Sequence, residues 1–438
     1  MDHGPRTTDH GLLREDHPSP HLAERVVEAE AGAARLWLLP TPVRDVVAFR
    51  GSFETAPDFA TDDDLVQHLL ADLLDKGTRR RDRFAVAAAL EGRGAELAFY
   101  PDGLRVGFAG KCLRADVADV LALAAEQLRE PLLDADEFVK EQARAVAGVR
   151  QAMDSTSAQA SGALKRRMYP PDHPNYNRPF EVERAALEAL TVERVREYHA
   201  AHFGGTGLRI AFAGDLDPAA VTEAVRATLG DWAPHGLAAR YAPDAAPTPP
   251  GRVDVPMADK HNLDCRFGHA LALRRDDDDF LPVYVGVFAL GGNFSARLMQ
   301  EVRDRQGLTY GIGAAVSGVA VEHGGHFRVS VSLSGANLER GLAATEEVVR
   351  RFVAEGVRAD ELAEKQETIA GTHVVGLATT GGLAARLLVN AERGFPVAYL
   401  DAYPDLVRAL TVDAVNEALR RHLDPDRLHL AVAGTLPA

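Results

Sequence analysis

The sequence predicts an α+β protein made of two homologous domains, each a sheet with helices packed on it. The first observation is an ungapped repeat, in which residues 190–216 match residues 410–436 at an offset of 220. The second is a match between LLDADEFVKEQ and GVRADELAEKQ, around Asp136 and Asp360, at an offset of 224. The third is that helices come in runs between strands, which favours α+β over a strictly alternating parallel sheet. Two copies of one domain of about 200 residues explain all three observations.

The elements of the first copy follow from hydrophobic periodicity. Both members of the ungapped repeat have the pattern of a helix, a turn and a strand whose apolar residues are close enough for burial on both faces. The helix from Asp136 begins with acidic residues, which the helix dipole favours in a first turn. Strands are predicted at 36–39, 46–53, 104–109 and 208–213, and helices at 63–75, 83–91, 115–128, 136–151, 185–190 and 192–201.

The second copy begins after a segment rich in Ala and Pro at 235–252, which has no sustained periodicity and is predicted to be a linker. Strands are predicted at 267–273, 327–333 and 428–433, and helices at 279–290, 295–303, 338–354 and 360–370. The predicted organisation is therefore a disordered polar leader at 1–20, an N-terminal domain at 21–234, the linker, and a C-terminal domain at 253–438.

Composition excludes several classes of protein. The 438 residues carry a net charge of −15, and no long basic stripe is present, which argues against nucleic acid and anionic membranes as partners. Cys112 and Cys265 are too few for a disulfide framework and fit a reducing compartment. No apolar run reaches the roughly 18 residues of a membrane span, and the leader has no apolar core of a signal peptide. We expect a cytoplasmic protein.

The common catalytic motifs HExxH, GxSxG, GxxxxGK[ST] and GxGxxG are absent from the sequence. Two segments stand out instead, LVQHLLADLLDKGT at 65–78 and LGGNFSARLMQEVRDRQGLTY at 290–310. Their arrangement on a duplicated chain of this length resembles the pitrilysin/insulinase family of metallopeptidases. The similarity is closest to the short two-domain bacterial members and to the subunits of the mitochondrial processing peptidase, and it covers roughly residues 20–438.

The resemblance implies a zinc site that has been lost. In that family the first helix carries H-x-x-E-H, two zinc ligands beside the Glu that activates water, and a third ligand, Glu, follows about 77 residues later. The matching positions hold His68, Ala71, Asp72 and Val149. One ligand of three remains and the general base is gone, so no metal is expected in this chain. Glu141 lies about 12 Å along a helix from the third position. His68 and Asp72 are expected to form a hydrogen-bonded i,i+4 pair.

The resemblance also implies a retained substrate site in the second domain. An Arg and a Tyr seven residues apart hold the substrate backbone in the family and stabilise the tetrahedral intermediate, and here they match Arg303 and Tyr310. A guanidinium suits carbonyl oxygens and a phenol suits a developing oxyanion. Gly291, Gly292 and Asn293 form a turn ahead of the next helix, and this turn either contacts a passing peptide or is only a tight connection.

A lost zinc site with a kept Arg/Tyr pair implies the non-catalytic subunit of a heterodimeric zinc metallopeptidase. The partner is then a homologous subunit that brings H-x-x-E-H and the zinc, and the substrate is a peptide. Three alternatives stay open from the sequence: a scaffold subunit, a homodimer that binds peptides without cutting them, and an active zinc peptidase with unusual ligands.

Overall fold

The computed structural model describes residues 21–235, 245 and 248–437, and within them the chain forms two mixed sheets with helices on both faces of each. The first sheet has the strand order β1-β2-β6-β3-β5-β4 and the second β7-β11-β8-β10-β9. The strands are β1 (Val27–Ala31), β2 (Ala34–Pro40), β3 (Val46–Glu54), β4 (Glu96–Asp102), β5 (Arg105–Leu113), β6 (Arg209–Gly214), β7 (Arg252–Pro256), β8 (Asn262–Leu271), β9 (Thr309–Ser317), β10 (Gly325–Ser334) and β11 (His429–Gly434). The predicted α+β class is confirmed.

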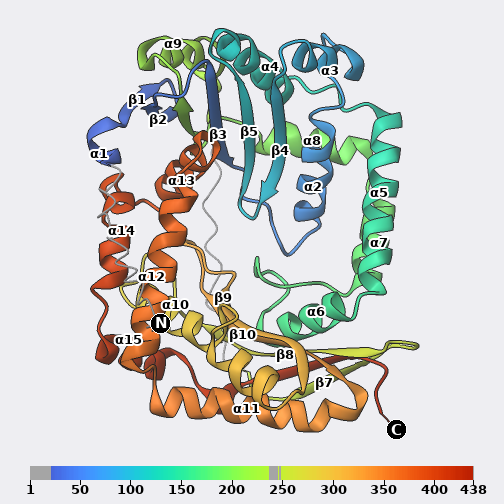
Figure 1. The fold of residues 1–438 in the computed structure, drawn as a ribbon. Coiled ribbons are helices and arrows are strands. Elements are labelled where there is room, and N and C mark those ends of the chain that lie inside the picture. Colours follow the sequence, from blue (N-terminus) through green and yellow to red (C-terminus); the bar gives the residue numbers. More distant parts are fainter. Residues whose placement is uncertain (1–20, 236–244, 246–247, 438) are drawn as a thin grey trace, which may run out of the picture.

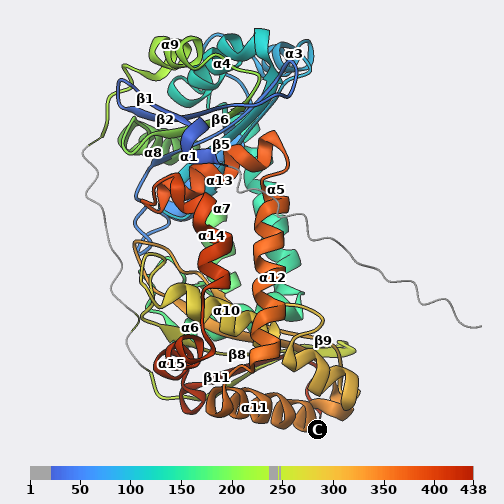
Figure 2. The same cartoon turned by 60° about the vertical axis from the view of Figure 1, so that its left-hand side comes forward.

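The helices fall into two sets, one in each half of the described chain. The first set is α1 (Leu22–Arg25), α2 (Asp63–Leu73), α3 (Arg83–Glu91), α4 (Val117–Arg129), α5 (Ala135–Met153), α6 (Thr156–Met168), α7 (Phe180–Ala189), α8 (Val192–His202) and α9 (Pro218–Leu229). The second is α10 (Phe280–Gly291), a π-helical turn η2 (Met299–Arg305), α11 (Leu338–Glu355), α12 (Ala359–Gly376), α13 (Thr380–Glu392), α14 (Ala398–Arg408) and α15 (Val412–His422). Figures 1 and 2 show the sheets at opposite ends of the molecule, with α5 and α7 on one side and α12 and α14 on the other running between them.

The internal repeat is visible in the details of the fold. Helices α8 and α15 have the same length and occupy equivalent positions in the ungapped repeat, and the Thr191 and Thr411 side chains cap them in the same way. A Thr side chain at this position accepts a backbone N–H that the first turn leaves free. Strands β6 and β11 follow at equivalent positions and end in Gly214 and Gly434, whose φ values are 147° and 146°.

The second repeat places one side chain in the same role in each half. The side-chain amide of Gln142 in α5 donates to the carbonyl oxygen of Leu190 at 2.9 Å, and that of Gln366 in α12 donates to Leu410 at 2.9 Å. The two glutamines occupy matching positions of the second repeat, and the two leucines occupy matching positions of the ungapped one. Since both bonds join a long helix to the start of the ungapped repeat, they fix equivalent parts of the two halves.

Each half completes the core of the other. Helix α13, from the second half, packs on β3 and β6 of the first sheet, where its buried Leu387 and Leu388 join a cluster with Trp37. Helix α6, from the first half, packs on β8 and β11 of the second sheet through Leu164. The two helices have equal lengths and are related by the same offset as the second repeat, so the exchange is reciprocal. The halves are therefore interlocked through buried apolar surface.

The structure differs from the predicted elements in two ways: it contains helices and strands that were not predicted, and some predicted elements begin or end at other residues. The elements α1, β1, β4, α6, α9, β7, β9, α13 and α14 were not predicted. The helix predicted at 295–303 is seen as the π-helical turn η2, which begins one turn later, at Met299. Arg252, placed in the predicted linker, begins β7, which pairs in parallel with β11. The leader predicted at 1–20 and the greater part of the predicted linker lie outside the described residues.

Candidate functional site

Helix α2 carries the positions that match the zinc motif. Its apolar face, with Leu65, Leu69 and Ala71, is buried, and His68 faces outward. The Nδ1 of His68 lies 2.7 Å from the carbonyl oxygen of Asp64, one turn earlier in the same helix. The expected hydrogen bond between His68 and Asp72 is therefore wrong, because the imidazole bonds to the backbone behind it.

The surroundings of α2 are occupied by charges that pair with one another. The carboxylate of the buried Glu141 lies 3.5 Å from Nζ of Lys76 and 2.6 Å from Arg144. Desolvation and, after it, the charge of Glu141 hold the pKa of the Asp72 carboxyl above its usual value. The charge of Glu141 thus acts on Asp72, although Glu141 is far from the third-ligand position along the helix. Val149, at that position, is buried in the apolar core of the first half.

Whether this chain can bind a metal ion depends on the side chains that could serve as ligands. Three or more His, Cys, Asp or Glu side chains arranged to hold a metal ion occur nowhere in residues 21–235 and 248–437. Around α2 the position of the general base holds the methyl group of Ala71, and that of the third ligand holds the isopropyl group of Val149. Hydrolysis by a zinc-bound water needs a base beside the metal. This chain's own residues do not provide that base at α2.

The glycine turn follows α10 and is packed closely against β9. A Cβ on Gly291 would lie 2.2 Å from the backbone N of Ala314 in β9, and one on Gly292 would lie 2.2 Å from the Phe288 ring. Both positions therefore require glycine for this packing. The turn is also held from the other side, because Nζ of the buried Lys365 in α12 lies 2.5 Å from Oγ of Ser295.

Four of the five predicted substrate residues line one cavity, and the fifth, Arg303, contacts its rim through Phe294. Gly291, Gly292, Asn293 and Tyr310 line a volume of about 290 Å³. Phe294 lines it too, and its ring is 78% exposed, while Tyr310 is 94% exposed. The Arg303 guanidinium carbon lies 5.7 Å from the centroid of the Phe294 ring, at cation–π distance. The structure therefore brings the five residues singled out in the sequence to one place.

The same cavity shows what sequence reasoning missed. Phe294 and Met299 also line it, and neither was singled out. Phe294 stands between the glycine turn and the helix, and an aromatic residue directly after such a turn is a signal that points to a binding surface. Tyr310 lies near the start of β9, which is the edge strand of the second sheet. The free edge of such a strand presents unpaired backbone N–H and C=O groups.

The fold and this site define a class of protein: a duplicated, two-sheet peptidase-like chain that keeps a candidate peptide site and lacks the zinc motif. Comparison with known proteins supports that class. Residues 189–369 match the peptidase M16 inactive domain family. The resemblance to the pitrilysin/insulinase family is thereby confirmed, and the matched residues are similar to the domain that the family model describes as inactive.

Individual relatives agree with the family match. An uncharacterized zinc protease of Streptomyces coelicolor is 26% identical over 329 residues, which cover 73% of this chain and 70% of the relative. A non-peptidase homolog of Helicobacter pylori is 20% identical over 166 residues, or 38% of each chain. The crystal structure of a peptidase M16 inactive domain from Pseudomonas fluorescens superimposes with a TM-score of 0.84 at 23% identity, over 94% of this chain and 99% of that one. This last likeness concerns the fold.

Proposed function

We propose that this chain is the non-catalytic subunit of a heterodimeric zinc metallopeptidase, and that it binds the peptide substrate opposite the zinc site of a homologous partner. The observation that carries the proposal is the cavity at the glycine turn, which is lined by the exposed rings of Phe294 and Tyr310, with the Arg303 guanidinium carbon 5.7 Å from the centroid of the Phe294 ring. Large exposed aromatic rings are uncommon on a surface that contacts only water. Their position beside an open sheet edge suits an extended peptide.

The side chains at this cavity have the chemistry that the role requires. Arg303 carries a guanidinium that stays charged and donates several hydrogen bonds to carbonyl oxygens. Its carboxylate partner is Asp304, at 3.6 Å, so most of its donors remain available. Tyr310 offers one phenolic donor, which suits an oxygen that becomes negative during attack on a peptide bond. In this proposal both act on a peptide that the partner's zinc-bound water attacks.

The edge strand β9 supports a peptide substrate. It pairs with β10 on one side, and it starts with Thr309 and the exposed Tyr310 and Gly311. An extended peptide gains backbone hydrogen bonds when it adds to such an edge. Backbone pairing is independent of side chains, so this surface would hold peptides of varied sequence and leave the choice of the cleaved bond to the partner.

The proposal assigns no cofactor to this chain and places zinc in the partner. The residues around α2 support this division, because the base position is Ala71 and the third-ligand position is the buried Val149. Within the described residues, no single helix is long and apolar enough to cross a membrane. Both cysteines are free and buried thiols, which suits the cytoplasm as the proposed compartment.

The first experiment identifies the partner and measures the activity of the pair. The tagged chain is purified from its own cells, and a co-purifying chain of similar mass that carries H-x-x-E-H is expected. Mixing the two purified chains should hydrolyse a quenched fluorescent peptide that neither chain hydrolyses alone. Arg303→Ala should lower kcat/KM by at least about tenfold, which corresponds to about 1.4 kcal/mol of transition-state stabilisation.

A matched control lies in the same helical turn. Arg305 is 66% exposed and pairs with Glu301 at 2.5 Å, so Arg305→Ala should leave the activity of the pair unchanged. Tyr310→Phe separates the hydroxyl from the ring and should lower kcat more than it raises KM. Full activity in both Arg303→Ala and Tyr310→Phe would show that the chain is a scaffold. Peptide binding by a pure homodimer without cleavage would favour the peptide-binding alternative.

A further inference from the structure

A second cavity, of about 120 Å³, lies among α10, α12, α13 and α14, apart from the glycine turn. Three arginines contribute to its wall: Arg275, which follows β8, Arg386 in α13, and Arg393 at the end of α13. The rest of the wall is mostly aromatic and neutral polar, and includes Tyr284, Phe288, Thr372, Asn390, Tyr399 and Tyr403. No Asp or Glu of the described chain lines it. In a protein with a net charge of −15, such a concentration of positive charge is unusual.

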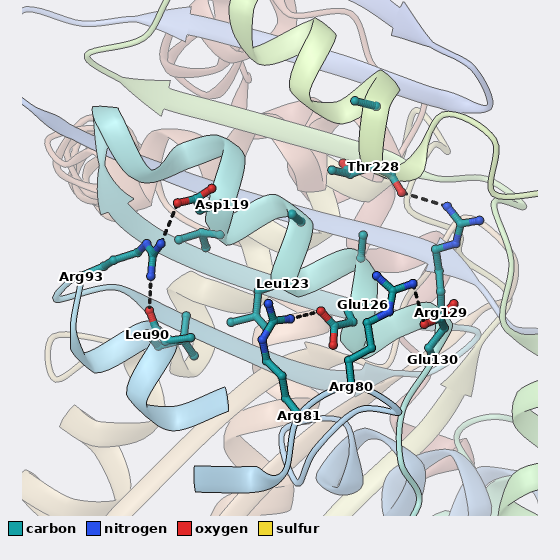
Figure 3. Close-up of a pocket in the computed structure, with 15 residues that line it drawn as sticks. Arg80, Arg81, Leu90, Arg93, Asp119, Leu123, Glu126, Arg129, Glu130 and Thr228 are labelled. Atoms are coloured by element: carbon teal, nitrogen blue, oxygen red, sulfur yellow. Dashed lines mark hydrogen bonds and ion pairs between the residues drawn. The ribbon is translucent and has the colours of Figure 1, made fainter. Parts of the chain in front are cut away.

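A cavity in the first half shows how arginines are balanced elsewhere in this protein. Figure 3 shows arginines and carboxylates side by side in that cavity, which is lined by residues of α3, α4 and α9. Arg93 pairs with Asp119 at 2.7 Å and Arg80 with Glu130 at 3.2 Å, and Arg81 pairs with Glu126. Arg129, the fourth arginine of that cavity, pairs at 2.6 Å with Asp231, which lies outside the lining, so each arginine there has a carboxylate partner.

The three arginines of the second cavity lack such partners in the part of the chain that the structure describes. Two acidic neighbours are engaged elsewhere: Glu392 bonds to Ser52 at 2.5 Å, and Asp401 accepts from the backbone N of Leu22 at 2.8 Å. Arg275 stacks on the Phe280 ring at 3.9 Å, and its Nε is buried with no hydrogen-bond partner. A buried donor without an acceptor destabilises the protein unless a ligand supplies one.

The cations also act on one another. Burial and, after it, the positive charge of Arg275 lower the pKa of the Arg393 guanidinium to about 10. Burial also lowers the pKa of Arg275, and Arg386 adds to this effect. Like charges held together in a partly desolvated space raise the free energy of the unliganded protein. An anion between them removes this repulsion, so the cavity is prepared for one.

We propose that the cavity among Arg275, Arg386 and Arg393 binds a phosphate group. Guanidinium groups bind phosphate through paired N–H donors, and three of them match a dianion better than the single charge of a carboxylate. The hydroxyl groups of Thr372, Tyr399 and Tyr403 are further donors on the wall. The volume suits one phosphate group, whereas a site for a whole organic ligand needs about 300 Å³ or more.

The phosphate comes either from free inorganic phosphate or from an organic phosphate. A neighbouring cavity of about 370 Å³ shares Arg275, Val389 and Arg393 with this one, so an attached organic group has space beside the phosphate. Arg275 follows a strand of the second sheet, whereas Arg393 ends the helix that packs on the first. A bound phosphate therefore links the second sheet to the helix that covers the first sheet, and the cavity shares no lining residue with the peptide cavity.

The test is calorimetric titration of the full chain with inorganic phosphate at fixed ionic strength, with chloride as the balancing anion. Saturable binding with a Kd below about 10 mM is expected. Arg386→Gln should weaken it at least about tenfold. Arg386 is exposed, so this variant should fold, and an unchanged unfolding temperature checks that it does. The matched control is Arg340→Gln, an exposed arginine of α11, which should change the affinity less than twofold.

Titrations with adenosine monophosphate and with acetate show which source of phosphate the site prefers and whether it prefers phosphate at all. Adenosine monophosphate that binds at least tenfold more tightly than phosphate assigns the site to an organic phosphate, and equal or weaker binding assigns it to free phosphate. The proposal is overturned if phosphate gives no saturable heat, if Arg386→Gln binds it as tightly as the unchanged chain, or if acetate binds as tightly as phosphate.

Discussion

Nζ of Lys365 lies 2.5 Å from Oγ of Ser295, and this contact joins the middle of α12 to the turn that lines the candidate peptide cavity. The ammonium group also lies 2.8 Å from the carboxylate of Glu364, so its charge is balanced although the side chain is only 1% exposed. A buried, paired lysine of this kind fixes geometry. It links the position of the turn at Gly291–Ser295 to the long helix that runs between the two sheets.

Lys365→Ala should lower the free energy of unfolding by about 2–4 kcal/mol, because it leaves a cavity and removes the hydrogen bond to Ser295. The measurement is urea denaturation followed by circular dichroism. Lys140→Ala is the control, since Lys140 is exposed and its ion pair with Glu137 is on the surface, so a change below about 0.5 kcal/mol is expected. Equal losses in the two variants would contradict the structural role of Lys365.

Gly291→Ala should also destabilise the protein, by about 1–3 kcal/mol, because its Cβ would overlap the backbone N of Ala314. Gly371 is the matched control. It lies inside α12, and a Cβ there meets nothing within 4 Å. Gly371→Ala should therefore stabilise the protein by about 0.5–1 kcal/mol through its higher helix propensity. Thermal unfolding should show a lower unfolding temperature for Gly291→Ala and a higher one for Gly371→Ala. An unchanged unfolding temperature in Gly291→Ala would show that the turn is loosely packed.

The sequence predicted those parts of the fold whose determinants are local. Helices α8 and α15 were found because both belong to the ungapped repeat, whose two members have the pattern of a helix, a turn and a strand. Helices α6 and α13 were missed, because the surface that each covers belongs to the sheet of the other half. The apolar face of such a helix is short, and the surface that it packs on lies far away in the sequence. The edge strands β4 and β9 were missed since edges carry weaker hydrophobic patterns than central strands.

The candidate site was predictable to a similar extent. Arg303, Tyr310 and the glycine turn were found through a motif confined to the single segment 290–310. The fold places Tyr310 and the turn in one cavity and Arg303 beside its Phe294 ring. The arginines at 275, 386 and 393 come from distant parts of the chain and form no local pattern. Their juxtaposition depends on how α13 crosses between the halves. Sequence reasoning therefore recovered a site contained in one segment and missed a site assembled by tertiary packing.

Metal content gives a direct test of the degenerate zinc positions. The purified chain, equilibrated with zinc and dialysed, should hold well under one zinc per chain, since Ala71 and Val149 offer no ligand. A chelator should leave the unfolding temperature unchanged, and His68→Ala should change the free energy of unfolding by less than about 0.5 kcal/mol. One tightly held zinc that disappears in His68→Ala would instead support an active peptidase with unusual ligands.

The stability of the protein should fall as the pH is lowered from 7 to 5. Burial and, after it, the neighbouring charge of His323 lower the pKa of His173 to about 4, and burial and then Lys165 lower that of His326 to about 3. Both imidazoles are neutral in the folded protein at pH 5, whereas in the unfolded chain they take up protons below a pH of about 6.5. The unfolded state then binds more protons, so acid favours unfolding, and these two groups contribute about 3–4 kcal/mol of the loss at pH 5 relative to pH 7.

Denaturant titrations at pH 7, 6 and 5 measure how the free energy of unfolding changes with pH. Two variants, one of a buried and one of an exposed histidine, show whether the buried imidazoles cause the change. His326→Asn removes one of the two groups and should reduce the loss between pH 7 and 5 by about 2 kcal/mol. His261 is exposed, so His261→Asn should leave the slope unchanged. Burial also lowers the pKa of His199, His269, His373 and His429, so these imidazoles add to the loss in the same direction. A slope that His326→Asn does not alter would mean that this imidazole already takes up its proton in the folded protein.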